Sequence, residues 1–309
     1  MNGTNKKLGS TDELRVLVLQ NGMQQIAIQK DVKGKFTFAN IEVPENLPLM
    51  LQAVYQGATY NKLIPPVPAM RNKEQKLVVY EKRDSLQDLK INSLLQIVKE
   101  SSGMRVYKIF LLDNVSNPPR AIANDKDPFL LYIPPNAQEI SAHLKQGKSQ
   151  MGIPLQLQKR ELGQSFPRAI LPGHSELEVS FLIREQKQGV FQFSDRMLFK
   201  NVAGFRPIFL KPKDIQVNFL AAKKFDKIEN DIPQGLQAFR VYYPLQKEIT
   251  FQLQGGTSVV QSPARQLSRR VVNGSIFTSQ LKSTYATLAI LGLLFSFSFL
   301  FVYKNRLSK

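Results

Sequence analysis

Apolar residues recur at every second position over much of this chain, and this spacing constrains the fold more than any other feature. In segment 176–181, Leu177, Val179 and Phe181 alternate with polar residues. Successive side chains of a β-strand point to opposite faces, so this spacing places one face on a core and the other toward water. We predict strands wherever the pattern recurs, in segments 14–18, 36–38, 176–181, 191–193, 239–243 and 249–254.

Turn-forming residues separate these segments at short intervals. Examples are Asn21-Gly22, Lys33-Gly34, Pro172-Gly173 and Gly255-Gly256. Short strands punctuated by frequent turns are typical of β-sandwiches. The body of the chain is therefore predicted to be all-β, with a β-sandwich architecture.

The stretch 86–112 admits two interpretations. Leu86, Leu89, Leu94 and Ile97 could form one face of a helix, whereas residues 89–97 also alternate with period two. A Ser-Ser-Gly turn at 101–103 leads into a second alternating run. We favour a β-hairpin here.

The scarcity of cysteine and histidine excludes several chemistries. The chain has no Cys, so it has no disulfide, thiolate nucleophile or Cys-based metal site. His143 and His174 are its only imidazoles. Asp125, Asp127 and Asn114 could offer oxygens to calcium, but Lys126 between the carboxylates weakens that reading. We predict a protein that is not an enzyme, with no cofactor and no metal.

Two further candidate sites compete with ordinary structural roles for the same residues. His174 and Ser175 could form a base and nucleophile of a hydrolase, but adjacent strand residues point to opposite faces, and a solvated turn histidine is favoured. Tyr55, Tyr60, Tyr242 and Tyr243 could form a ligand surface, and a core or cross-strand role is favoured for them.

The chain is strongly basic, with 42 Lys and Arg against 24 Asp and Glu, a formal charge of +18. Such a charge suits nucleic acid or an anionic lipid surface. The cations, however, recur singly or in pairs, and no run of five exists. Nucleic acid is therefore disfavoured as a partner.

The C-terminal region carries a long apolar segment. No charged residue occurs between Lys282 and Lys304, which leaves 21 residues. At 1.5 Å per residue, a helix of that length crosses the roughly 30 Å hydrocarbon core of a bilayer. We predict a transmembrane helix over 284–303, followed by a basic tail at 304–309. Its anchoring residues are Tyr285, Leu288, Ile290, Leu293, Phe297, Phe301, Tyr303, Lys304 and Arg306.

Orientation follows from the distribution of cations around this segment. Lys304, Arg306 and Lys309 lie within six residues of its end, whereas the cations before it are scattered in a long domain that would translocate regardless of charge. We place the tail in the cytoplasm of a bacterium, the helix in the inner (cytoplasmic) membrane and the bulk outside. The first 20 residues lack a signal-peptide core. Either an export signal once preceded Met1, or the chain is tail-anchored.

Two joints divide the chain. The Pro-rich segment 64–68 is predicted to be extended, because each proline disfavours a helical conformation in the preceding residue. A strand is then predicted at 77–80. Residues 256–283, rich in Gly, Ser, Gln and Arg, read as a stalk. The predicted units are a first β-sandwich at 1–68, a second all-β sandwich region at 76–255, the stalk, the helix and the tail.

The N-terminal segment contains Gly34-Lys35-Phe36-Thr37-Phe38, Ile41-Glu42-Val43-Pro44 and the 51–60 run LQAVYQGATY. With these residues it resembles a carboxypeptidase regulatory-like (transthyretin-like) domain. The resemblance implies a β-sandwich whose glycine turn feeds an F-x-F strand. The opening strand of such domains is missing before Met1, which implies an N-terminally shortened domain.

The layout of the whole chain is similar to a group of bacterial membrane-anchored proteins that carry this domain. The resemblance implies architecture rather than a reaction. We expect a non-enzymatic envelope protein whose partners are membrane lipid and an envelope or membrane protein. Two alternatives stay open: an accessory subunit that contacts a membrane enzyme or assembly complex through its helix, and a hydrolase with a site near His174.

Overall fold

The computed structural model describes residues 1–20, 22–39, 41–123, 128–147, 152–199, 207–222, 224–243 and 248–258. Within these ranges the protein is all-β, as predicted, and the strands form several sheets. The one helix of the described residues is α1, a single turn over Pro68–Arg71. In those same ranges, no helix has the length and apolar character that a bilayer crossing requires.

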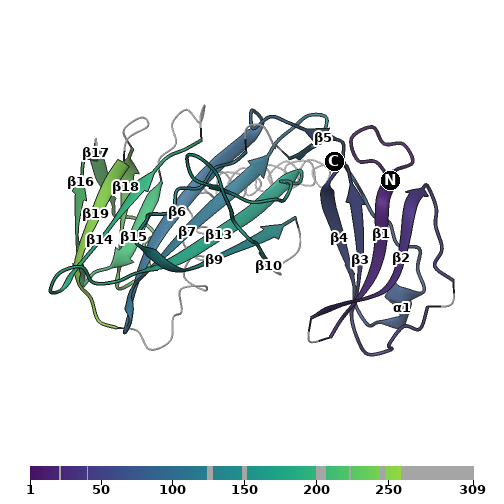
Figure 1. Ribbon diagram of the computed structural model, residues 1–309, viewed down its shortest axis with the longest axis horizontal. Coiled ribbons are helices and arrows are strands. Elements are labelled where there is room, and N and C mark those ends of the chain that lie inside the picture. Colours follow the sequence, from purple (N-terminus) through teal and green to yellow (C-terminus); the bar gives the residue numbers. More distant parts are fainter. Residues whose placement is uncertain are drawn as a thin grey trace, which may run out of the picture.

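The N-terminal sheet has four strands in the order β2-β1-β3-β4. Its strands are antiparallel and form the right-hand body of Figure 1. Their bounds are β1 Ser10–Leu19, β2 Met23–Lys33, β3 Leu49–Tyr55 and β4 Ala58–Ile64. After β4, the segment predicted to be extended contains a bend at Pro66, where Val67 N–H donates to Pro65 O at 2.8 Å. Val67 is extended, and Pro68 then begins α1, at a position where its missing N–H costs nothing.

The remaining strands form a second, larger body, which we call the main body. Its principal sheet has eight strands in the order β10-β9-β13-β7-β6-β15-β18-β17. Their bounds are β6 Leu89–Glu100, β7 Gly103–Asn114, β9 Ala137–Gln146, β10 Ile153–Pro154, β13 Gly173–Ile183, β15 Ile208–Pro212, β17 Lys224–Ile228 and β18 Leu236–Tyr242. The pair β15–β6 is parallel, and the other neighbours in this sheet are antiparallel.

Three smaller sheets complete the main body. They comprise β14 Val190–Arg196, β16 Ile215–Leu220 and β19 Glu248–Gly255 in one sheet, β11 Gln158–Lys159 with β12 Gln164–Ser165, and β5 Lys82–Arg83 with β8 Ala121–Ile122. Phe193 and Phe251 from the three-stranded sheet pack in one cluster with Phe181 and Phe209 from the eight-stranded sheet. Two sheets thus enclose a core, which is consistent with a β-sandwich.

Most alternating segments are strands, because one of their faces is buried as the spacing predicts. Segments 14–18, 176–181, 191–193 and 249–254 fall within β1, β13, β14 and β19, and 239–243 reaches the end of β18. The hairpin predicted for 86–112 is also confirmed, with β6 and β7 paired from Glu100 and Gly103 at the turn to Leu89 and Asn114 at the far end.

Two strand predictions were wrong. Phe36 and Phe38 do alternate in burial with exposed Thr37, but they lie in an irregular segment that packs across the N-terminal sheet without joining it. At 77–80 only Val79 makes a bridge, a parallel one to Asn2. The pairing ends there because the chain turns away after Asn2.

The polar face of β13 is buried, whereas the alternation predicts that it faces water. Leu177, Val179 and Phe181 do share the core face, yet Glu178 and Ser180 are only 8% exposed on the other. β13 lies between β7 and β9, and side chains of these neighbouring strands flank its polar residues. Ser180 Oγ, for example, lies 2.9 Å from Ser141 Oγ of β9.

The two bodies share a core and a backbone contact. Leu14, Ala53 and Tyr60 of the N-terminal sheet lie in one buried cluster with Val79, Ala121 and Ala169. The first residues of the chain bind residues 65–81, which we call the connector between the bodies. Val79 N–H donates to Met1 O at 3.0 Å, and Gly3 N–H donates to Val79 O at 2.7 Å. We call residues 1–4 the N-terminal clip. The two bodies and their junction are visible in Figure 1.

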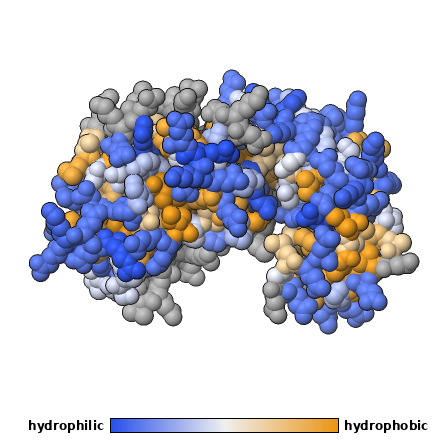
Figure 2. Space-filling view, viewed as in Figure 1, coloured by the Kyte–Doolittle hydropathy of each residue, from blue (hydrophilic) through white to orange (hydrophobic). Residues whose placement is uncertain are grey.

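The predicted membrane segment 284–303, the tail 304–309 and most of the stalk lie outside the described residues. The start of the stalk is described and is held by hydrogen bonds. Thr257 donates its backbone N–H and its hydroxyl to Asp214 Oδ2, at 2.7 and 2.8 Å. Both hydrogen bonds lower the pKa of the Asp214 carboxyl, and the one from the Thr257 hydroxyl has the larger effect. In the view of Figure 2, hydrophilic residues cover most of both bodies, with apolar residues showing between them.

Candidate functional site

A buried lysine interrupts the apolar face of β7. Met104 and Val106 belong to one core cluster, Phe110 and Leu112 belong to another, and Lys108 occupies the position between them in the same alternating register. The eight-stranded sheet therefore carries two apolar cores on one face, with a charged side chain at their boundary. Because an unpaired buried charge is very costly, a partner is expected close by.

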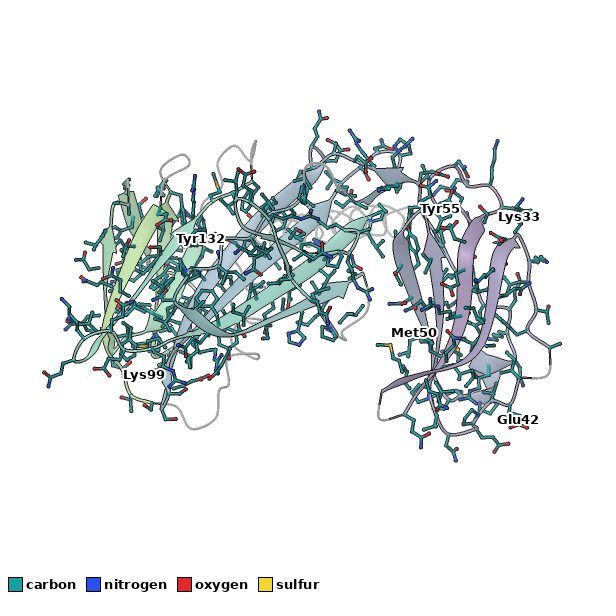
Figure 3. All side chains as sticks on the ribbon, in the orientation of Figure 1. Lys33, Glu42, Met50, Tyr55, Lys99 and Tyr132 are labelled. Carbon is teal, nitrogen blue, oxygen red and sulfur yellow. The ribbon has the colours of Figure 1, made fainter. Side chains whose placement is uncertain are left out.

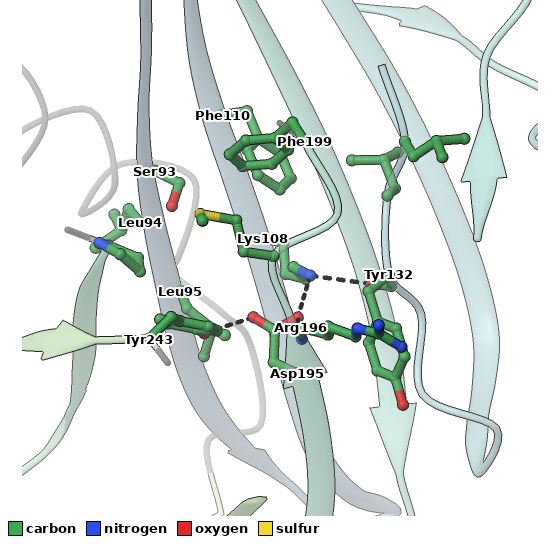
Figure 4. A pocket seen from close by; sticks show the side chains of 14 residues that line it. Ser93, Leu94, Leu95, Lys108, Phe110, Tyr132, Asp195, Arg196, Phe199 and Tyr243 are labelled. Atoms are coloured by element: carbon green, nitrogen blue, oxygen red, sulfur yellow. Dashed lines mark hydrogen bonds and ion pairs between the residues drawn. The ribbon is translucent and has the colours of Figure 1, made fainter. Parts of the chain in front are cut away.

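Asp195 at the end of β14 is that partner. Its Oδ1 atom lies 2.5 Å from Lys108 Nζ, and both side chains are only 8% exposed. Lys108 Nζ also donates to the backbone carbonyl of Tyr132 at 2.9 Å. The hydroxyl of Tyr243 donates to Asp195 Oδ2 at 2.6 Å, and Arg196 N–H donates to Oδ1 at 2.9 Å. Figure 4 shows this network between the strands.

The electrostatics of the network favour one protonation state. Burial, together with the nearby Asp195 carboxylate, raises the pKa of the Tyr243 hydroxyl well above its ordinary value. The pKa of Tyr132 is raised as well, mainly by burial and secondly by the hydrogen bond to Glu248. Both tyrosines therefore stay neutral donors near neutral pH. Tyr132 uses its proton to bind Glu248 Oε1 at 2.8 Å.

The space beside the network is too small for a substrate. Its cavity measures about 20 Å³ and is lined by residues that include Ser93, Lys108, Asp195, Arg196 and Tyr243. A cavity of this size holds about one water molecule, whereas sites for small-molecule ligands measure roughly 300–1,000 Å³. The cluster has ionisable groups that could transfer protons, but it has no room for a reacting molecule. Its geometry is that of a structural polar contact between two sheets.

Sequence reasoning missed this network, although a signal for it exists. Asp195 stands two residues after Phe193 and four after Phe191, in the same inward-facing register. Lys108 stands likewise between Val106 and Phe110. A charged residue at an inward position of a strand indicates a buried ion pair. The pairing itself joins residues 87 apart in sequence, which no local pattern predicts.

The structure separates His174 from Ser175. His174 Nδ1 lies 2.8 Å from Asp113 Oδ1 on the neighbouring strand, and the imidazole is 84% exposed. Ser175 points to the opposite face, where its side chain is buried. A histidine oriented by a carboxylate is part of the arrangement that a hydrolase needs, but the predicted nucleophile does not face it. His143 lies two strands away from β7, on β9, opposite Glu178 of β13.

The four tyrosines of the ligand-surface hypothesis do not form one surface. Tyr60 is buried in the N-terminal body and Tyr243 is half-buried in the main body. Both have a raised pKa, because removal of the hydroxyl from water disfavours the phenolate. Tyr55 lies at the junction of the bodies, where its hydroxyl donates to Glu81 Oε1 at 3.0 Å. Tyr242 donates to Asp226 Oδ2 at 2.9 Å.

Glu81 is the centre of a second polar network, at the junction. Its carboxylate accepts hydrogen bonds from Asn2 Nδ2, the Tyr55 hydroxyl and Gln56 Nε2. Its backbone N–H donates to Thr4 Oγ1 at 2.9 Å. The N-terminal clip, the β3–β4 turn and the connector therefore meet at one residue.

Metal ligation has no evident site in the part of the chain that the structure describes. No group of three or more His, Asp and Glu side chains converges there. Asn114 instead donates its amide to the carbonyls of Arg120 and Ile170, at 2.7 and 3.0 Å. Asp125, Lys126 and Asp127 lie outside the described residues.

Comparisons with known proteins do not assign the chain to a family. No protein-family model matches it, and no curated protein matches it. The resemblance to carboxypeptidase regulatory-like domains remains a prediction from the residues quoted above.

Proposed function

We propose that this chain is a non-enzymatic, membrane-anchored envelope protein that presents β-sandwich modules for binding or scaffolding. The observation that carries the proposal is the 21-residue charge-free segment with its basic tail, which follows an all-β body. A helix of that length suits a bilayer, and a flank of three cations suits its cytoplasmic side.

The geometry of the interior supports a binding role over a catalytic one. Lys108 and Asp195, whose side chains are both buried, satisfy each other, and their cavity admits about one water molecule. His174 has an orienting carboxylate but no serine facing it. Such groups stabilise a fold without requiring a substrate.

The proposed organisation follows the joints of the sequence. Residues 1–68 form a first module of carboxypeptidase regulatory-like type, and 76–255 form a second β-sandwich region. Residues 256–283 are the stalk, 284–303 the membrane helix, and 304–309 the cytoplasmic tail in the bacterial inner membrane. The shared core at Tyr60 and Val79 supports presentation of both modules as one unit.

Membrane association is tested by fractionating bacteria that express the chain. The full chain should sediment with membranes and resist carbonate extraction, and a variant that ends at residue 258 should be released. Protease added to spheroplasts should digest the β modules and spare a tag placed after Lys309. A carbonate-soluble full chain would contradict the anchor, and protection of the β modules would contradict the topology.

The partner is tested by crosslinking membranes and purifying the full chain. Recovery of one specific envelope or membrane protein is expected, and recovery of none would contradict the binding role. Scrambling residues 288–301 at constant hydrophobicity is the control for the helix. Retention of the partner assigns contact to the β modules, and its loss assigns contact to the helix, as in an accessory subunit.

A further inference from the structure

The outer edge of the N-terminal sheet is formed by β2, which has a strand partner on one side. β2 pairs with β1, and none of the other described strands pairs with it. Most of its residues are exposed. An unpaired strand edge presents a row of backbone N–H and C=O groups that can accept another strand.

A bulge shapes this edge. Ala27 pairs with Val16 and Gln25 pairs with Leu17, which leaves Ile26 as an extra residue without a partner on β1. A bulge bends its strand and redirects the unpaired side chain. Two residues further along, the Ile28 side chain is 43% exposed. Ile26 itself packs against the buried cluster that contains Val16 and Leu51, so Ile28 is the exposed apolar side chain at the bulge.

A groove runs between this edge and the segment that follows β2. Ile26, Ala27 and Ile28 line it on the strand side, and Phe38, Ala39, Ile41 and Glu42 line it on the other. Its volume of about 510 Å³ falls within the range of ligand sites in proteins. Further along the same loop, the carbonyls of Pro44 and Leu47 accept hydrogen bonds from the Arg71 guanidinium, which holds that part of the loop in place.

The charge of the groove is concentrated in one side chain. Of the seven residues that line it, Glu42 alone is ionisable. Figure 3 places Glu42 on the outer side of the N-terminal body, facing away from the main body, with Lys33 at the opposite end of that side. A ligand that fills the groove would meet apolar side chains, backbone groups of a strand edge, and one carboxylate.

We propose that this groove binds an extended peptide segment of a partner protein, which adds to the sheet along β2. The segment would have apolar residues at alternate positions and a Lys or Arg that faces Glu42. Main-chain hydrogen bonds give such complexes their affinity, and side-chain pockets give them specificity. The inference rests on the proposed binding role and names the surface that performs it.

A single extended chain fits this groove better than a second copy of the protein does. Phe38, Ala39 and Ile41 line the groove beside the strand edge, so the segment 38–42 restricts access of a bulky occupant to that edge. A second copy would have to insert a whole sheet edge there. A single peptide strand can pair with the edge of β2 at the usual spacing of about 4.8 Å between paired strands.

The experiment uses the full chain in detergent and capped seven-residue peptides that alternate Val and Thr. One peptide has a central Lys, a second has a central Glu, and a third has the Lys with proline at alternate positions. Fluorescence anisotropy should show at least tenfold tighter binding of the Lys peptide than of the Glu peptide, and no binding of the proline peptide. The Glu42→Lys variant should reverse the preference. Glu45→Lys, three residues away and outside the groove lining, should leave it unchanged.

Each contrary outcome overturns the inference. Absence of binding of the Lys peptide at millimolar concentration, equal binding of the Lys and Glu peptides, or equal effects of Glu42→Lys and Glu45→Lys would each do so. Self-association of the chain that Glu42→Lys abolishes would assign the groove to another copy instead. If Glu42→Lys still recovers the crosslinked partner from membranes, the groove is excluded while the proposed function stands.

Discussion

Lys108 shows how one residue can divide a core. Its side chain separates the cluster around Phe181 from the cluster around Phe110, and Asp195 neutralises it across the space between the sheets. Replacing a buried pair by apolar residues can be neutral, whereas breaking it leaves a charge without a partner. The stabilising value of the pair is therefore seen only when one partner is removed.

We expect Lys108→Met to lower the free energy of unfolding by about 3–5 kcal/mol, because Asp195 would remain buried and charged. Asp195→Asn should have a similar cost, and the double variant should lose less than the sum of the two. Urea denaturation of the chain ending at residue 258 measures all three. Lys90→Met, at an exposed position of β6, is the control and should change stability by less than about 0.5 kcal/mol. A loss below 1 kcal/mol for Lys108→Met would contradict the assignment.

Buried tyrosines make the fold sensitive to alkali. The pKa of Tyr60 and of Tyr243 is raised in the folded protein, mainly by burial, so the unfolded chain loses these protons first. Stability is then complete below the unfolded value of about 10 and falls as pH rises above it. Phenolate absorbance should show a late group of tyrosines that ionise together with unfolding. Ionisation of all nine tyrosines near pH 10 without unfolding would contradict this.

At the scale of elements, the N-terminal clip depends on a residue without a side chain. A Cβ atom on Gly3 would lie 2.2 Å from Tyr80 Cε1 and 2.8 Å from Val78 Cγ1. These separations are far shorter than a carbon–carbon contact of about 3.5–4.0 Å. Gly3 therefore permits the close approach that the hydrogen bonds to Val79 require.

We expect Gly3→Ala to open the clip and to cost about 1–3 kcal/mol, the usual range for overpacking. Hydrogen exchange should then become faster at the amide of Val79, which binds Met1 O. Gly152→Ala is the matched control, because its nearest neighbour, His143 Cβ, lies at an ordinary 3.5 Å. Unchanged exchange at Val79 in Gly3→Ala would show that the clip does not depend on this contact.

The strands are the part of the fold that local sequence predicts well. β14 and β19 follow from alternation because one sheet face is buried and the other is not, and the β6–β7 hairpin follows from the turn at its tip. Phe36 and Phe38 show the limit, because alternating burial arises wherever an extended segment crosses a sheet, whether or not it pairs. The site at Lys108 and the clip at Val79 depend on contacts between residues distant in the chain, which spacing does not encode.

At the scale of the molecule, the N-terminal sheet completes its core with residues from the connector and from the main body. Tyr60 packs with Val79, Ala121 and Ala169, and its hydroxyl donates to Tyr80 O at 2.9 Å. A fragment of residues 1–75 would expose these apolar surfaces and leave the Tyr60 hydroxyl without its partner. Small domains that lose part of their core are marginally stable.

We therefore expect the fragment 1–75 to be largely unfolded, and the chain 1–258 to unfold in a single thermal transition. Circular dichroism measures both, and the amide dispersion of the fragment in NMR spectra provides an independent check. A fragment that unfolds cooperatively near the melting temperature of the longer chain would show that the N-terminal sheet does not need the shared core.

The position of β19 has a mechanical consequence. β19 leads directly to Thr257 and the predicted stalk, and it is the central strand of its sheet, paired with β14 on one side and β16 on the other. Tension between a membrane-held tail and a ligand on the modules would enter the protein along this strand. To slide it out, a force must break the hydrogen bonds to two neighbours at once rather than peel one edge apart. With the proposed anchor, the chain would receive load at a strand suited to resist it.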